Sequence, residues 1–221
     1  MKVAVSWSGG LESSLACHKV MKDGHDVACL VTFVLDQYWP AMGHPPQIMR
    51  IQSESMGIPL VMLKVEEPYK EGYRKAIAGL IETRGIEGIV TGDIYVVDDV
   101  HGNWMESVCE GLDIKVMMPL WERDTSEVLD DEMSSGFRAV FTCVKQPWFN
   151  EEWIGRELNK YTVKDLLALA KKQGMDPCGE NGEYHTMVID GPIFKKPIKI
   201  PKFTKEKSET RFYMKVTGLF L

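Results

Sequence analysis

The sequence predicts an α/β protein built on a doubly wound parallel sheet, with a smaller C-terminal unit. Short apolar runs alternate along the chain with segments of helical periodicity. Residues 27–35 form a near-continuous apolar run, which is typical of a strand buried on both faces. A glycine turn joins the first strand to the first helix. This alternation of strands and helices favours a parallel sheet.

Length and composition set the broad class of the protein. The 221 residues suffice for one sizeable α/β domain and a small second unit. A net charge of −6 argues against a general nucleic-acid-binding surface. No apolar run reaches the roughly 18–20 residues of a membrane span, and no signal-peptide pattern precedes the first strand. The five cysteines are scattered, four of them within apolar runs, so we expect a reduced, cytoplasmic protein without a membrane partner.

The predicted elements follow in order from apolar runs and capping signals. Strands are predicted at residues 3–6, 27–35, 60–65, 88–94, 114–117 and 138–144. Helices are predicted directly after Gly10 and at residues 47–56, 69–83, 103–110, 125–134 and 163–173, with Thr125 and Thr162 as N-caps. Residues 36–46 read as a loop and residues 145–160 as a connecting segment. We therefore expect a nucleotide-binding domain over residues 1–145 and a substrate-binding unit over residues 146–221.

The turn Ser6-Trp7-Ser8-Gly9-Gly10 is the first candidate binding site. A strand that ends in glycines just before a helix lets backbone N–H groups approach a phosphate, and the helix dipole favours the anion. Ser8, Ser13 and Ser14 add hydroxyl groups. The alternative is an ordinary strand-to-helix turn, because two adjacent glycines alone are weak evidence.

Ligands of doubly wound sheets bind outside the carboxyl ends of the strands. That rule gathers four predicted strand ends at one edge: Ser6–Gly10, Thr32–Asp36, Thr91–Asp93 and Thr142–Lys145. Asp93 is the carboxylate best placed to orient a substrate or Mg²⁺. Its alternative role is a loop cap after Gly92. The signal at Thr32 is weaker, because a threonine in a strand usually only packs.

A second cluster of polar residues lies near the C-terminus. Glu180, Asn181, Glu183 and His185 occur within six residues and are set among glycines. They read as an acidic pocket for an amine or ammonium, in which Glu183 or His185 accepts a proton. A β-hairpin turn at Asn181-Gly182 is the alternative and does not exclude the pocket. A zinc site is disfavoured, because Cys178 and His185 lack further ligands at suitable spacing.

Two motifs resemble a known family. Ser8-Gly9-Gly10-x-x-Ser13 resembles the pyrophosphate loop (PP-loop) of the N-type ATP pyrophosphatases. Cys178-Gly-Glu-Asn-Gly-Glu-Tyr-His-Thr186, with the segments at 91–94, 119–124 and 190–192, resembles the diphthine–ammonia ligase family over about residues 1–200. The resemblance implies an adenine nucleotide alpha hydrolase-like (HUP-type) fold. It also implies a ligase that adenylates the carboxylate of diphthine on elongation factor 2, after which ammonia displaces AMP.

The resemblance implies ligands and roles for individual residues. ATP, Mg²⁺, ammonium and a carboxylate acceptor are the expected ligands, the acceptor being diphthine or a small molecule. The nucleotide-binding residues would be Ser6, Ser8, Gly9, Gly10, Ser13, Thr32 and Gly92. The acceptor side would use Glu180, Asn181 and Tyr184, and catalysis would use Glu183, Asp93 and His185. We predict no resident metal centre formed by protein ligands, and a homodimer is compatible with the sequence.

The sequence departs from the family pattern at two places. Leu11 and Glu12 stand where the pyrophosphate loop usually has Lys and Asp, and a Lys there normally supplies a point charge to the phosphates. Val100–Glu106 lacks both arginines of the Tyr-Gln-Arg-x-Arg-x-Glu segment that members acting on diphthine usually carry. The departures leave open a non-catalytic nucleotide-binding or sensory protein. A sulfur-transferring relative would need Cys178, whose acidic neighbours oppose a thiolate.

Overall fold

The structure is a computed structural model that describes residues 1–35, 43–95 and 103–221. The chain divides into two compact units. The first unit comprises Met1–Ser8, Glu12–Trp39 and Ile58–Glu122. The second unit comprises Gly9–Leu11, Pro40–Gly57 and Arg123–Leu221. The chain therefore leaves the first unit for three residues, in the middle of the glycine turn, and then returns to it.

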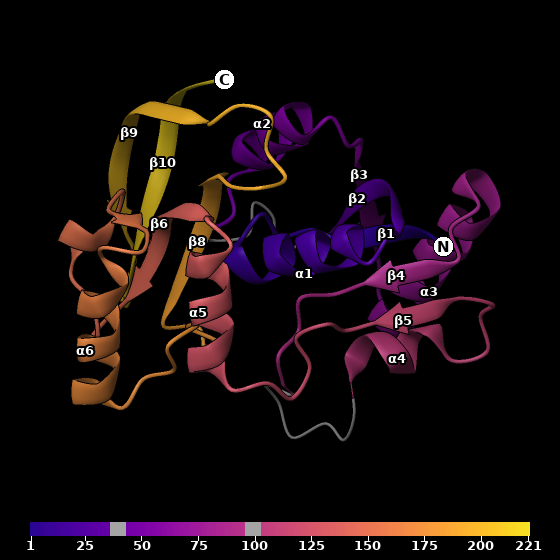
Figure 1. Ribbon diagram of the computed structural model, residues 1–221, viewed down its shortest axis with the longest axis horizontal. Helices are drawn as coiled ribbons and strands as arrows, with labels where there is room; N and C mark the ends of the chain where they lie inside the picture. Colours follow the sequence, from indigo (N-terminus) through magenta and orange to yellow (C-terminus); the bar gives the residue numbers. More distant parts are fainter. Residues whose placement is uncertain (36–42, 96–102) are drawn as a thin grey trace. The chain divides into compact units, whose positions relative to one another are not determined.

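The first unit is built on a five-stranded parallel sheet in the order β3-β2-β1-β4-β5 (Figure 1). Its strands are β1 (Lys2–Ser6), β2 (Asp26–Leu35), β3 (Leu60–Val65), β4 (Gly88–Val90) and β5 (Lys115–Met117). Its helices are α1 (Leu11–Lys22), α3 (Tyr69–Arg84) and α4 (Trp104–Cys109). The predicted doubly wound parallel sheet is confirmed.

The crossover rule explains how the helices cover this sheet. Parallel crossovers are right-handed, so α1, which leads from β1 to β2, lies on the face opposite α3 and α4, which lead the other way. The α3 and α4 face holds a buried apolar cluster: Ala4, Cys29, Val31, Ile77, Leu80, Ile86, Ile89, Met105, Val108 and Cys109. The order of strands reverses at β1 and β4, whose carboxyl ends are therefore the expected ligand-binding edge.

The second unit is built on an antiparallel sheet. Its strands are β6 (Arg138–Lys145), β7 (Glu157–Leu158), β8 (Tyr184–Asp190), β9 (Lys199–Lys207) and β10 (Arg211–Phe220). The order is β7-β6-β10-β9, and β8 also pairs with β6. Its helices are α2 (Pro46–Met56), α5 (Thr125–Ser134) and α6 (Val163–Gln173), with a short 3₁₀ turn at Glu151–Trp153.

Strand β6 corrects one prediction about the sheet. The sequence placed residues 138–144 in the parallel sheet and the domain boundary after residue 145, whereas β6 pairs antiparallel with β7, β8 and β10. The change of unit falls instead between Glu122 and Arg123. The run is mostly apolar because β6 is buried along most of its length, a pattern that either kind of sheet produces. Thr142–Lys145 consequently does not belong to the carboxyl edge of the parallel sheet.

Three local predictions also need correction. The N-cap of α5 is Asp124, whose Oδ1 accepts from Ser126 N at 2.9 Å and Glu127 N at 3.2 Å, and not Thr125. Thr162 stands at the start of α6 but makes no capping bond to that helix, because its hydroxyl donates to Glu157 O at 2.8 Å. A turn does occur at Asn181-Gly182, yet it is no hairpin, since α6 precedes it and β8 pairs with β6.

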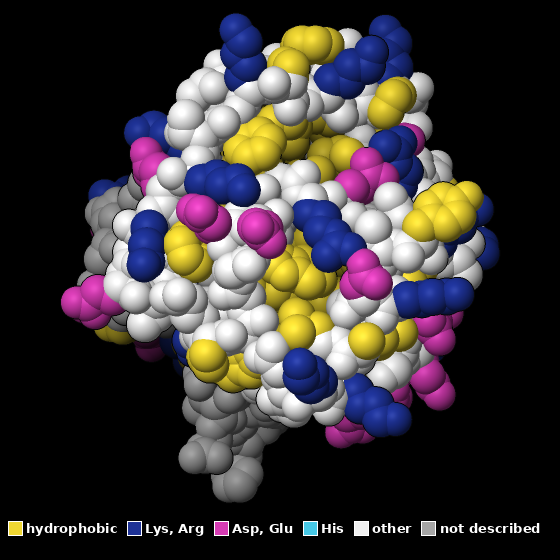
Figure 2. All heavy atoms as spheres, turned by 90° about the vertical axis from the view of Figure 1, so that its left-hand side faces the viewer, with side chains coloured by type: hydrophobic (Ala, Val, Ile, Leu, Met, Phe, Trp, Pro, Cys, Tyr) yellow, Lys and Arg dark blue, Asp and Glu magenta, His cyan; other side chains and the backbone are white. Residues whose placement is uncertain are grey.

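The β9–β10 hairpin was not predicted, and β9 forms an edge of the antiparallel sheet. Figure 2 looks onto the side of the molecule where α6, β9 and β10 lie, and shows Lys and Arg side chains spread among apolar ones. On β9, Lys199, Lys202, Lys205 and Lys207 are all exposed. Lysines on an edge strand discourage pairing with a strand of another chain. No helix within the described ranges is both long and apolar enough to cross a lipid bilayer.

Candidate functional site

In the first unit, the end of β1 is held rigidly before the glycine turn begins. Trp7 N donates to Val31 O at 2.7 Å, and Thr32 Oγ1 donates to Trp7 O at 2.7 Å. Thr32 is buried, and this bond gives it a structural role in orienting the strand end. Ser8 is exposed and its hydroxyl donates to the buried Ser13 Oγ at 3.2 Å. Ser6 ends β1 and is partly buried.

Gly92 packs directly against the start of α1. A Cβ atom at this position would lie 2.7 Å from the carbonyl carbon of Glu12 and 2.8 Å from Ser13 N. Such distances are far inside van der Waals contact, so only glycine fits. The loop after β4 and the N-terminal turn of α1 are therefore in backbone contact at the sheet edge where strand order reverses, as the sequence predicted for these residues.

Two further polar groups lie in the loop after β4. Thr91 is 2% exposed, and its hydroxyl has no hydrogen-bond partner among the described residues. Asp93 is exposed, and its Oδ2 accepts from Asn103 Nδ2 at 3.2 Å, which leaves Oδ1 for an ion or a substrate. Asn103 also caps α4, because its Oδ1 accepts from Met105 N at 2.8 Å. The sequence did not mark Asn103 as a site residue, although it did predict a helix beginning there.

In the second unit, Gly9 is anchored by two groups. Its carbonyl oxygen accepts from Val188 N in β8 at 2.9 Å and from Gln52 Nε2 in α2 at 2.9 Å. Gln52 is fully buried and also donates to Val188 O at 2.7 Å. Gly9 has φ +80°, and a Cβ there would lie 2.5 Å from Gln52 Oε1. Gln52 is the residue that sequence reasoning missed, because a buried glutamine 43 positions away leaves no local signal.

Leu11, directly after the glycine turn, takes part in the core. Its side chain is 1% exposed and is among the largest fully buried side chains. Thus, where the pyrophosphate loop of the family usually presents a Lys, this chain buries an apolar group. Gly10 is buried, and its backbone stays within the turn that the sequence predicted.

We expect Leu11→Lys to lower the free energy of unfolding by about 3 kcal/mol without nucleotide, because it buries an ammonium that has no counter-charge. ATP should raise the melting temperature of this variant more than that of the wild type, since phosphates would supply that counter-charge. Leu11→Met conserves volume and serves as the control. Differential scanning calorimetry with and without ATP measures both effects, and an equal ATP effect on all three proteins would contradict this expectation.

Glu183 is the buried carboxylate of the C-terminal motif. It is 2% exposed and lies in the turn that leads into β8. Its Oε1 accepts from Asp176 N at 3.0 Å, whereas Oε2 has no hydrogen-bond partner among the described residues. A buried carboxylate oxygen without a donor is costly, and a bound donor such as ammonium removes that cost.

His185 has a different character from the one predicted. Burial, together with the nearby charges of His44 and Arg211, lowers its pKa to about 3. It is therefore neutral near pH 7, and a group with so low a pKa is a weak general base. Its ring packs at an angle of 56° against that of His44, with centroids 4.8 Å apart. Glu183 therefore stays the predicted proton acceptor.

The remaining predicted acceptor residues differ in exposure. Asn181 is exposed and Glu180 is partly buried, and Glu180 N donates to Asp176 Oδ1 at 3.4 Å. Tyr184 is 3% exposed, and its hydroxyl donates to Pro177 O at 2.6 Å. Its ring packs against Phe141 with centroids 5.1 Å apart. The structure gives Tyr184 a role in the core, and its role in binding stays a prediction.

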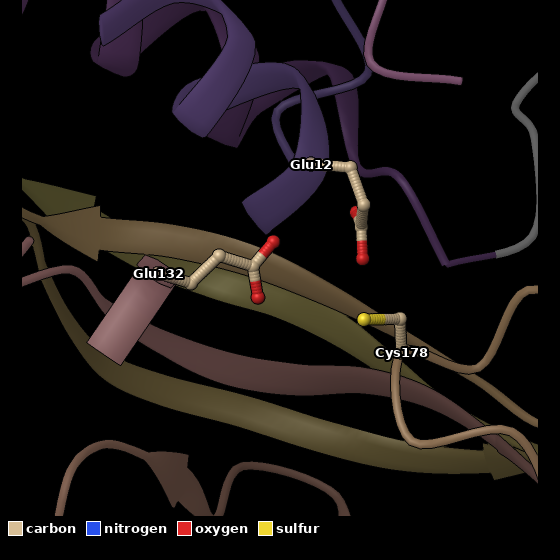
Figure 3. A group of neighbouring side chains, drawn as sticks. All are labelled: Glu12, Glu132 and Cys178. Carbon is tan, nitrogen blue, oxygen red and sulfur yellow. The ribbon is translucent and has the colours of Figure 1, made fainter. Parts of the chain in front are cut away.

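Cys178 is a buried cysteine that forms no disulfide with any described residue. Its Sγ donates to Thr125 O at 3.1 Å and is buried. Figure 3 shows this thiol and the buried Glu132 carboxylate pointing toward each other, and the two ligand atoms lie within 4.8 Å. A neighbouring carboxylate and burial both disfavour a thiolate, which argues against the sulfur-transferring relative.

Parts of two predicted segments lie outside the described residues. Residues 36–42 belong to the predicted loop that ends at Pro46, and Val100, His101 and Gly102 open the segment that departs from the family pattern. The described end of that segment forms α4, where Trp104 is exposed and its ring packs edge-on against Tyr73 with centroids 6.0 Å apart.

A parallel sheet in this order, with a glycine turn between β1 and α1, defines a doubly wound α/β protein of the nucleotide-binding class. Family models agree and are more specific. The diphthamide synthase N-terminal domain matches residues 1–116 and the diphthamide synthase C-terminal domain matches residues 124–219, so the chain belongs to the diphthamide synthase family. The gap between the two matches contains the change of unit at residues 122–123.

Curated proteins similar to this chain are named diphthine–ammonia ligase. The diphthine–ammonia ligases of Schizosaccharomyces pombe, Bos taurus and Homo sapiens are each 28% identical to this chain over 90% of its length. The chain covers 82% of the Bos taurus and Homo sapiens proteins. It covers 36% of the Schizosaccharomyces pombe protein, which is therefore much longer.

Proposed function

We propose that this protein is an ATP-dependent, amide-forming ligase of the diphthine–ammonia ligase type. A carboxylate oxygen of the acceptor attacks the α-phosphorus of ATP, and the bond to the β-phosphate breaks to release pyrophosphate. Ammonia then attacks the acyl carbon, and the bond to AMP breaks. The products are an amide, AMP and pyrophosphate. The observation that carries this proposal is Glu183, a buried carboxylate with one oxygen available for a donor, within the motif that resembles this family.

The glycine turn supports the first half-reaction. Backbone N–H groups of residues 8–13 and the N-terminus of α1 suit a polyphosphate. Asp93 Oδ1 is suited to hold the Mg²⁺ that accompanies ATP, because carboxylate oxygen is a preferred ligand of that ion. Bound Mg²⁺ would offset the phosphate charge. The buried Thr91 hydroxyl would donate to the nucleotide.

Glu183 supports the second half-reaction. Its anionic Oε2 would bind ammonium and then accept the proton that converts ammonium to the nucleophile ammonia. The Asp176 N–H holds Oε1, so the carboxylate keeps its orientation during proton transfer. Glu183 immediately precedes β8, whose Val188 anchors Gly9. The carboxylate and part of the glycine turn are thus joined through one strand, about 16 Å apart along it at roughly 3.3 Å per residue.

The carboxylate acceptor has two candidate identities. We propose diphthine on elongation factor 2, since the curated relatives are named for diphthine, or a small carboxylic acid, since the segment before Glu106 lacks the usual arginines. We further propose that the protein acts in the cytoplasm and as a homodimer. A non-catalytic nucleotide-binding protein remains the competing function only because of Leu11 and Glu12.

The test supplies purified protein with ATP, Mg²⁺ and ammonium, together with elongation factor 2 from cells whose own ligase is deleted. Release of AMP and pyrophosphate in equal amounts, dependent on ammonium and acceptor, is the expected result. A parallel reaction with cell extract depleted of protein searches for a small acceptor. ATP binding without AMP release in either reaction would support the non-catalytic alternative.

A further inference from the structure

A pair of like charges stands directly opposite each other in the antiparallel sheet. Arg211, the first residue of β10, is in register with Lys145, the last residue of β6. Both side chains are partly buried. Like charges at such positions lie close together on one face of a sheet and are destabilising. An anion bound beside Arg211 and Lys145 would offset their repulsion.

No described carboxylate supplies that compensation. Arg211 donates from Nη1 to Cys143 Sγ at 3.7 Å, a weak interaction, and the Lys145 ammonium lies 5.3 Å from the centre of the Trp148 ring. Neither cation forms an ion pair with any residue in the described part of the chain. Most guanidinium donors of Arg211 therefore remain available, in a fork whose geometry matches a carboxylate.

The two cations adjoin the C-terminal motif. A Cβ atom on Gly182 would lie 3.2 Å from Arg211 Nη2, and Lys145 N donates to Glu183 O at 2.8 Å. His185 is in register with Cys143, the residue that contacts Arg211. Burial, followed by the nearby charges of His44 and Arg211, lowers the pKa of His185 to about 3. The Arg211 guanidinium therefore lies beside Gly182, and the backbone of Lys145 is bonded to that of Glu183, the residue that carries the buried carboxylate.

We propose that Arg211 and Lys145 form the subsite that binds the carboxylate of the acceptor, beside the Glu183 position that binds ammonium. This inference rests on the proposed function for the identity of the acceptor. Arg211 binds one oxygen of the carboxylate and leaves the other oxygen to attack ATP. The reaction converts this anion into a neutral amide, so the subsite binds the substrate and releases the product.

The experiment uses butyrate as the carboxylate probe and butyramide as its neutral isostere, at constant ionic strength. The side-chain ¹⁵N signals of Arg211 are followed by NMR in the whole protein. We expect butyrate to shift these signals saturably and butyramide to leave them in place. Arg211→Gln should weaken butyrate binding roughly tenfold or more, as loss of a hydrogen bond between charged groups does. Arg211→Lys should retain part of the affinity.

Lys215→Gln is the matched control, because Lys215 lies on the same strand, is exposed, and pairs with Glu206 at 2.7 Å. It removes one positive charge and should leave butyrate affinity unchanged. Arg211→Gln should also melt no lower than the wild type, because it relieves the like-charge pair, whereas loss of a structural arginine would lower the melting temperature.

Three results would overturn the proposal: no butyrate-specific shift in the wild type, unchanged butyrate affinity in Arg211→Gln, or Arg211 signals that respond to AMP and not to butyrate. The last result would assign the cations to a phosphate. Butyrate binding that depends on Arg211 would support the subsite even if the protein released no AMP. Failure of the subsite proposal and failure of the proposed ligase activity are therefore distinguishable.

Discussion

Glu183→Gln should lower amide formation by ~10²-fold or more, the usual loss when a general base is removed. ATP affinity should stay near that of the wild type, because Glu183 is proposed to serve only the ammonium step. Oε1 is held by Asp176 N–H, and the glutamine oxygen can replace it there. The adenylated acceptor, or the AMP from its hydrolysis, should then accumulate without amide.

The measurements are single-turnover formation of amide and calorimetric binding of ATP. Glu127→Gln, an isosteric change at an exposed site in α5, is the control for loss of one negative charge. Melting temperatures of both variants check that the fold is intact. If Glu183→Gln lost ATP binding while keeping its melting temperature, the C-terminal motif would belong to the nucleotide site and the proposed division of roles would be wrong.

Gly92→Ala should weaken nucleotide binding roughly 10- to 100-fold. Its new methyl carbon would overlap the backbone at Glu12 and Ser13, and relieving an overlap of this kind typically costs about 1–3 kcal/mol. The first turn of α1 has to move, and with it the N–H groups that are proposed to bind phosphate. The change makes no new charge and removes no hydrogen bond.

Calorimetric titration with ATP measures this loss. Gly79→Ala is the matched control, because Gly79 lies within α3 with no atom within 4 Å of its added Cβ. Alanine in a helix is favourable by up to about 1 kcal/mol relative to glycine, so this variant should be at least as stable as the wild type. Wild-type ATP affinity in Gly92→Ala would show that the start of α1 does not bind the nucleotide.

Much of the first unit was predictable because its signals are local. The five strands of the parallel sheet and the glycine turn follow from apolar runs and from residues that permit tight turns. Helix ends were predicted correctly where glycine supplies a left-handed conformation, as at Gly57 with φ 71°. The N-cap of α5 was missed by one residue, because Asp124 and Thr125 are both good N-caps and only the observed bonds distinguish them.

The sequence predicted the positions of some candidate site residues but not the hydrogen bonds of others. Gly92 and Ser8 lie where the strand-end rule placed them, and Ser13 accepts a hydrogen bond from Ser8. Thr32 and Tyr184 are instead committed to hydrogen bonds within the fold, to Trp7 O and Pro177 O. The sequence shows that a threonine or tyrosine has a hydroxyl group, but not which acceptor that hydroxyl will donate to.

The sequence by itself determined the alternation of strands and helices, the glycine turn and the motif around Glu183, since each depends on neighbours along the chain. Only the tertiary structure decided that β6 joins an antiparallel sheet, that Gln52 anchors Gly9, and that Arg211 faces Lys145. An apolar run shows that a strand is buried but not which strand lies beside it. Backbone groups are the same in every residue, so strand partners and the side chains they bring together emerge only when the whole chain packs.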